Sequence, residues 1–436
     1  MKKTVLTSTI YLITLSIISK MLSFIVRIIL ARKLPEQAMS YYSLAAPTMV
    51  FVITLAQMGI PAALSKVIAQ SKQPSSPLIA SIILAVINNL VIMAAYLILL
   101  PLLAIHVFKQ EDILPVLYAV LPLIPLVTLS GILKGYLFGL QEHIPATASQ
   151  LFEEGSRILF IVLVFYFSPM LDIITMAKAA MLSISIGEAS SSLYMLYVLL
   201  RKKRNPLRIP LSKFRLQKHQ FQEVLSVSIP MMGSRIIGSL TYFLEPIAMV
   251  IGLSQASAAS MVLAYGQLNG YVLPIITMPS FITVTLSNYL LPSFTYSYTR
   301  GYHEHAMKLF RIIISCCLFI GICCSLLCYF FPEQLLNLFY HNTQGAHILK
   351  QLAIPFALYS LQPPLSSMLH ALSLSSKSVR DTLYGSITRI LCILCLTSVY
   401  HESVLPIALT IGMLITTLFH AIRLYQAFRL YEKEHS

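Results

Sequence analysis

Two basic residues interrupt the first apolar stretch of the chain. Lys20 and Arg27 lie seven residues apart in the segment SKMLSFIVR, residues 19–27. Seven residues of α-helix make about two turns, so both side chains lie on one face. Lys20 lies too deep in the stretch for its amine to reach water, whereas Arg27 is nearer the end and could do so. Two cations on one helix face could bind an anion such as a phosphate or a diphosphate.

The composition of the chain shows why these charges are unusual. Its 436 residues are 57% hydrophobic and 11% charged, and the mean hydropathy is +0.78. This is typical of a protein that crosses a membrane many times. Because the apolar stretches are far longer than barrel strands of ~10 residues, we predict an all-α polytopic membrane protein. The twelve predicted spans are 4–30, 41–64, 78–104, 113–138, 147–168, 173–200, 221–252, 259–292, 307–331, 347–372, 383–400 and 404–428.

Lysine and arginine residues gather on one side of these predicted spans. The net charge of +15 could suggest a nucleic-acid partner. The basic residues lie mostly in the loops on one side of the membrane, however, so we expect no nucleic-acid partner. If the N-terminus is inside, the outer loops hold only Arg32, Lys33 and Lys109. The positive-inside rule therefore predicts that both termini are cytoplasmic.

A basic segment divides the chain near its midpoint, with six predicted spans on each side. We predict an N-terminal six-helix bundle over residues 1–200, a cytoplasmic linker over 201–220 and a C-terminal six-helix bundle over 221–436. Six spans per half would make the two bundles parallel repeats around a central cavity, an arrangement typical of transporters.

Weak sequence similarity between the halves supports this duplication. The segment LIPLVTLSGILKGYLFGL at 123–140 resembles AIPFALYSLQPPLSSMLHAL at 353–372. Further along, Arg157 aligns with Arg389 and Gly187 aligns with Gly412.

Other charged residues also fall inside the predicted spans. Glu153 and Arg157 are four residues apart and could neutralise each other on one helix face. Glu188 has no evident partner, and Arg235 could face the cavity or pair with Glu153 or Glu154. The candidate structural or coupling charges are Glu153, Glu154, Arg157, Glu188 and Glu245.

No motif in the sequence indicates catalysis. The chain has no GxxxxGK[ST] phosphate loop, no HExxH and no GxSxG, so we expect neither an enzyme nor a cofactor or metal, although a membrane potential or an ion could drive transport. Cys392 and Cys395 form a CxxC pair without a His or carboxylate to complete a ligand set, and we predict that they only pack. Lys134 is predicted to anchor the cytoplasmic end of a span.

Several stretches resemble a known family. They are SKMLSFIVRIILARKLP at 19–35, YYSLAAPTMVFVITLAQMGIPAALSKVIAQ at 41–70, GYLFGLQEHIPATASQLFEE at 135–154 and AYGQLNGYVLPIITMPS at 264–280. They are similar to bacterial polysaccharide exporters of the stage V sporulation protein B type, within the multidrug/oligosaccharidyl-lipid/polysaccharide (MOP) flippase superfamily, which also contains the lipid II flippases. The resemblance covers nearly the whole chain.

This resemblance implies a MATE-like fold and a flippase that moves a lipid-linked glycan on undecaprenyl diphosphate to the outer leaflet of the bacterial cell membrane. Lys20 matches the basic position of the family's S-[K/R]-x-L-x-F stretch, Arg27 matches the arginine that follows, and Lys66 matches the basic residue after G-I-P. Ser23 replaces the family's usual Gly, and Ser40 stands where lipid II flippases carry an acidic residue. Lipid II is therefore only one candidate cargo.

Three classes of function stay open at this point. The first is a flippase whose anionic head group binds Lys20, Arg27, Lys66 and Arg235, with membrane lipids and cell-wall synthesis enzymes as partners. The second is a cation-coupled multidrug exporter of the same fold. The third is a non-transporting scaffold in envelope or spore assembly.

Overall fold

A computed structural model describes residues 2–70, 75–168, 170–201, 218–251, 253 and 255–435. All regular elements among these residues are helices, which confirms the predicted all-α class. The chain forms two compact units, unit 1 over Met1–Pro246 and unit 2 over Ile247–Ser436. The predicted linker at 201–220 lies almost entirely outside the described residues.

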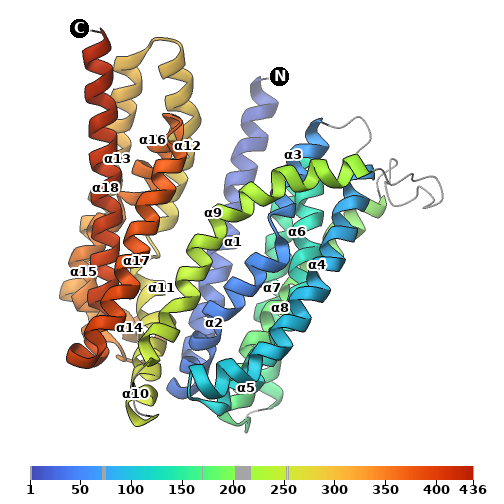
Figure 1. Cartoon of the computed structure of the whole chain (residues 1–436), viewed down its shortest axis with the longest axis vertical. Helices are drawn as coiled ribbons and strands as arrows, with labels where there is room; N and C mark the ends of the chain where they lie inside the picture. Colours follow the sequence, from blue (N-terminus) through green and yellow to red (C-terminus); the bar gives the residue numbers. More distant parts are fainter. Residues whose placement is uncertain are drawn as a thin grey trace. The chain divides into compact units, whose positions relative to one another are not determined.

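Unit 1 is built from long helices, some of which are broken into shorter segments (Figure 1). In chain order its elements are α1 (Lys2–Lys33), α2 (Glu36–Gln57), α3 (Ile60–Gln70), α4 (Ser75–Pro101), η1 (Leu102–Val107), η2 (Glu111–Ile113), α5 (Leu114–Tyr118), α6 (Leu123–Gly139), α7 (His143–Phe167), α8 (Ile173–Arg201) and most of α9 (Lys218–Val250). The core includes Ile60 and Leu64 of α3, Tyr136 and Leu137 of α6, and Met195 of α8.

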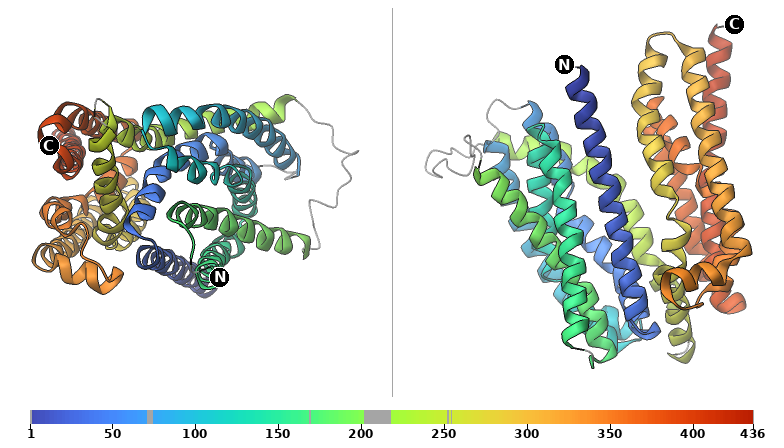
Figure 2. Two further views of the ribbon diagram at one scale, coloured as in Figure 1. Left: turned by 90° about the horizontal axis from the view of Figure 1, so that it is seen from below. Right: turned by 180° about the vertical axis from the view of Figure 1, so that it is seen from behind.

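Unit 2 has a similar set of helices, seen nearly end-on in the left view of Figure 2. Its elements are α10 (Gln255–Gly266), η5 (Gln267–Val272), α11 (Leu273–Ile276), α12 (Ser280–Thr299), α13 (His303–Phe330), α14 (Pro332–Tyr340), α15 (Ala346–Tyr359), α16 (Gln362–Ala371), α17 (Ser375–Tyr400), η6 (His401–Ser403) and α18 (Val404–His435). Phe294, Phe310, Met368 and Leu424 join α12, α13, α16 and α18 in one core.

The helices account for the predicted membrane spans. Among the described residues, seven helical stretches are long and apolar enough to cross a bilayer, and two bent pairs raise the number to nine. The last of the seven, Ser375–Arg429, contains both α17 and α18. The other two predicted spans correspond to α7, which carries several charges, and to α15 with α16, which are 14 and 10 residues long. This arrangement is consistent with twelve spans.

The same close helix crossing occurs once in each unit. A Cβ on Gly187 of α8 would lie 2.7 Å from Arg157 Cγ on α7, and a Cβ on Gly412 of α18 would lie 3.0 Å from Arg389 Cβ on α17. These are the glycine and arginine pairs that the sequence repeat aligned. Small residues let helices approach closely in lipid, so the repeated sequence preserves a packing contact.

The second predicted span breaks at a glycine that α9 covers. Met58 and Gly59, between α2 and α3, have φ values of 48° and 68°. A Cβ on Gly59 would lie only 2.6 Å from the backbone oxygen of Ser228, and the Ser228 hydroxyl donates a hydrogen bond to the Met58 carbonyl. Glycine is therefore required here by both backbone conformation and space.

Gly59→Ala should destabilise unit 1, because alanine at positive φ is strained and its Cβ would meet backbone rather than a movable side chain. We expect the free energy of unfolding in mixed micelles to fall by about 1–3 kcal/mol, measured by circular dichroism. Gly155→Ala in α7 is the matched control, since its Cβ would meet nothing within 4 Å. Equal stability of the two variants would contradict the assignment.

Candidate functional site

The four cations predicted to bind an anion all lie in unit 1. Lys20 and Arg27 belong to α1, Lys66 to α3 and Arg235 to α9, and all four side chains are exposed. Within the part of the chain that the structure describes, none of them forms an ion pair with a carboxylate. Each could therefore accept an external anion.

Lys20 lies close to a carboxylate of the neighbouring helix. Helix α1 packs along α7, and this places Lys20 within electrostatic range of Glu154, with Ser23 beside the same carboxyl group. A cation deep in a membrane span needs a counter-charge or water. Glu154 provides such a counter-charge for Lys20 from within the same unit.

Helices α6, α7 and α8 bring five charged residues together, which we call the unit 1 charge cluster: Lys134, Glu153, Glu154, Arg157 and Glu188. Arg157 Nη1 lies 2.9 Å from Glu154 Oε2, and Lys134 Nζ lies 3.2 Å from Glu153 Oε2. Lys134 Nζ also lies 4.0 Å from Glu188 Oε2. The cluster links three spans by charge.

This pairing differs from the one expected from sequence. The predicted i,i+4 pair of Glu153 with Arg157 is wrong, because Arg157 bonds to Glu154, one residue closer. The interpretation of Lys134 as a simple helix-end anchor is also wrong, since α6 presents it to Glu153 and Glu188. Spacing along one helix gives no information about a partner that packs from another helix.

The cluster contains three carboxylates and two cations, so Lys20 is the third cation that balances its charge. Glu154 is 9% exposed and Glu188 is 8% exposed. Breaking a buried ion pair leaves an uncompensated charge and costs far more than losing a surface pair. Arg157 Nε and Glu188 Oε2 have no hydrogen-bond partner in the described part of the chain.

The remaining predicted carboxylate lies in α9. It is Glu245, which is only 2% exposed.

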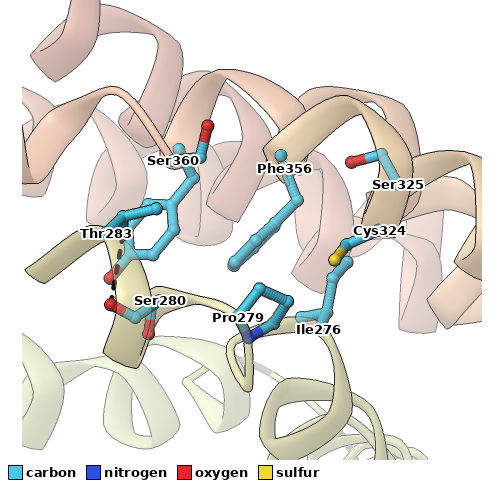
Figure 3. Close-up of a pocket in the computed structure, with 10 residues that line it drawn as sticks. Ile276, Pro279, Ser280, Thr283, Cys324, Ser325, Phe356 and Ser360 are labelled. Atoms are coloured by element: carbon cyan, nitrogen blue, oxygen red, sulfur yellow. Dashed lines mark hydrogen bonds between the residues drawn. The ribbon is translucent and has the colours of Figure 1, made fainter. Parts of the chain in front are cut away.

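Two cavities of unit 2 are poor candidates for an anionic head group. The one drawn in Figure 3 has a volume of about 20 Å³ and lies beside Pro279, at the break between α11 and α12. It has room for about one water molecule. The other, of about 380 Å³, is lined by Glu402 and His401 but by no lysine or arginine, so its fixed charge would repel an anion.

Sequence reasoning missed a second group of buried charges, in unit 2. Asp381 was placed outside its predicted span of 383–400, but α17 begins at Ser375 and includes it. Its partners are His420 and Arg423 of α18. The i,i+3 spacing of His420 and Arg423 within an apolar helix was the signal that could have found them.

Comparison with known proteins places the chain in a family. Residues 5–297 match the family described as "Polysaccharide biosynthesis protein". The chain belongs to this polysaccharide biosynthesis protein family. It is also 31% identical to stage V sporulation protein B of Bacillus subtilis (strain 168), over 96% of this chain and 83% of that protein. The resemblance seen in the sequence is thereby confirmed.

Solved structures show the fold of this family member. A multidrug resistance MATE family transporter of the MOP superfamily in an inward-facing conformation matches with a TM-score of 0.74 and 16% identity, over 96% of each chain. The lipid II flippase MurJ in an inward closed conformation matches with a TM-score of 0.71 and 13% identity, over 95% of this chain and 87% of that one. The predicted MATE-like MOP fold is confirmed.

Lys134→Ala should destabilise the protein, because Glu153 and Glu188 would lose the cation between them. The Lys134 side chain is 21% exposed, so water screens part of the loss and we expect a decrease in unfolding free energy of about 1–3 kcal/mol. The melting temperature in detergent, measured by circular dichroism, reports this change.

The matched control is Lys178→Ala, which removes an exposed lysine of α8. The double variant Lys134→Met with Glu153→Gln should recover part of the lost stability, since it removes opposite charges together. If Lys134→Ala melts at the same temperature as Lys178→Ala, the ion pairs do not hold these helices together.

Proposed function

We propose that this protein is a flippase that moves an anionic lipid-linked saccharide across the membrane by alternating access. The observation that carries the proposal is the set of four exposed cations in unit 1, Lys20, Arg27, Lys66 and Arg235, none of them in an ion pair among the described residues. The family assignment supports a role with saccharides.

A diphosphate head group suits these residues chemically. Lysine and arginine are the usual partners of phosphate oxygens, and arginine can donate two parallel hydrogen bonds. A charge as deep as Lys20 costs ~2.5–3.5 kcal/mol to insert, so it is expected to serve a purpose there. A phosphate would compete with Glu154 for Lys20.

The direction of transport follows from the orientation proposed for the chain. The basic residues favour cytoplasmic termini in the bacterial cell membrane. An inside-negative potential would then favour outward movement of net negative charge by ~2.3 kcal/mol per charge per 100 mV. In this proposal the lipid tail stays in the bilayer while the head group crosses through the protein, and enzymes of cell-wall synthesis supply and consume the cargo.

Lys20→Ala and Arg27→Ala should each slow flipping of labelled undecaprenyl-diphosphate saccharide in proteoliposomes by about tenfold or more, since a hydrogen bond to a charged group contributes ~1.5–3 kcal/mol. Lys33→Ala is the control, because Lys33 is an exposed lysine at the end of the same helix. Wild-type rates in both test variants would contradict the cationic site.

A cation-coupled multidrug exporter is the second candidate. The buried carboxylates Glu188 and Glu245 favour it, since such groups could bind a coupling cation inside the membrane. Drug resistance that appears on expression and is abolished by Glu188→Gln or Glu245→Gln would favour this function. If instead no cavity charge matters and only surface loops do, the protein is an assembly scaffold.

A further inference from the structure

A buried carboxylate in unit 2 binds two basic side chains. Asp381 of α17 is fully buried, at 0% exposed. Its Oδ1 accepts a hydrogen bond from Arg423 Nε at 2.5 Å, and its Oδ2 lies 3.1 Å from His420 Nδ1. We call Asp381, His420, Arg423 and Ser378 the unit 2 charge cluster. It lies in the second turn of α17, at the end of unit 2 that carries the C-terminus (Figure 1).

The hydrogen bonds assign the protons on His420. An ionised carboxylate is only an acceptor, so His420 Nδ1 carries a hydrogen and donates it to Asp381. In the neutral ring Nε2 is then a bare acceptor, and it lies 3.4 Å from Ser378 Oγ. Ser378 Oγ in turn lies 3.2 Å from Ser366 Oγ of α16. Because Ser366 is half-buried whereas His420 is 2% exposed, the two hydroxyls lead from the surface of unit 2 to Nε2.

Protonation of His420 would change the net charge of the unit 2 charge cluster. Asp381 and Arg423 cancel, so the cluster is neutral when His420 is neutral. Asp381 on α17, Arg423 on α18 and His370 on α16 act electrostatically on the ring. The charged residues of α15, His347 and Lys350, lie in its first two turns, at the start of the span that ends near His370. Asp381 is the carboxylate that acts most strongly on His420.

We propose that His420 is a proton-binding site and that its occupancy releases Arg423 from Asp381. A proton from water passes through the Ser366 and Ser378 hydroxyls and forms an N–H bond at Nε2. The Ser378 hydroxyl then accepts a hydrogen bond from His420 Nε2–H and donates its own hydrogen bond to Ser366 Oγ. One carboxylate now faces two cations, and Arg423 leaves because its side chain is the more exposed of the two, at 22% against 3% for His420.

Release of Arg423 would loosen one end of a helix pair. Gly385 and Gly412 hold α17 and α18 in close backbone contact, with a Cβ on Gly412 only 2.8 Å from Gly385 O. Asp381 lies one turn from Gly385 toward the C-terminus-bearing end, so beyond this crossing the unit 2 charge cluster joins the two helices. The proton would therefore control the last turns of α18, independently of the anion-binding residues proposed in unit 1.

Hydrogen–deuterium exchange on the full-length protein in nanodiscs tests this site without any cargo. Rates at about pH 7.5 and about pH 4.5, so that the lower value lies well below the usual histidine range, are corrected for the intrinsic pH dependence of amide exchange. In the wild type, amides of residues 419–429 should exchange about tenfold faster or more at the lower pH, because a charge-assisted hydrogen bond is lost. In His420→Gln the rates should not change with pH.

Two further variants make the outcome decisive. His370→Gln is the control, since His370 is an exposed histidine of α16 in the same unit, and it should respond to pH like the wild type. In Arg423→Gln, amides of residues 419–429 should exchange fast at both pH values. This variant replaces His420→Gln as the test if His420→Gln does not fold. Flat exchange in the wild type, or a pH response that survives in His420→Gln or Arg423→Gln, would overturn the proposal.

Discussion

Each charge inside a bilayer must find water or an opposite charge, and the structure is organised around this constraint. The backbone satisfies itself within helices, which is why all regular elements of the described residues are helical. Charged side chains, in contrast, are not neutralised by the hydrogen bonds of their own helix. The charges of the unit 1 charge cluster therefore lie together where α6, α7 and α8 pack, because each of these helices alone would carry an uncompensated charge.

The two units share a close helix crossing but differ in the charged residues near it. In both, a glycine lets an arginine-bearing helix cross closely, at Gly187 of α8 with Arg157 and at Gly412 of α18 with Arg389. In unit 1 the neighbouring charge cluster has one carboxylate more than it has cations, and the exposed Lys20 lies beside it. In unit 2 the carboxylate of Asp381 is shared by a histidine and an arginine. In the functions proposed above, the first arrangement serves an anion and the second a proton.

The fold was largely predictable from sequence, because the length and apolarity of each span are local properties of the chain. The repeat was predictable for the same reason, since Gly187 and Gly412 sit in similar segments. The partners of charged side chains were not. Arg157 could reach Glu153 or Glu154 from its own helix, and only the packing of α6 against α7, which delivers Lys134 to Glu153, decides between them. Asp381 was missed because a span boundary drawn by hydropathy excluded the polar first turns of α17. The anion-binding role of Lys20 and its companions stays a prediction.

In the proposed function, the exposed cations of unit 1 bind the diphosphate head group of a lipid-linked saccharide. The most direct measurement is mass spectrometry of the lipids that co-purify with the wild-type protein and with the Lys20→Ala, Arg27→Ala double variant. A polyprenyl-diphosphate saccharide should be enriched on the wild type and lost from the double variant, while ordinary phospholipids stay equal. Equal enrichment on both proteins, or only bulk phospholipid on the wild type, would contradict it.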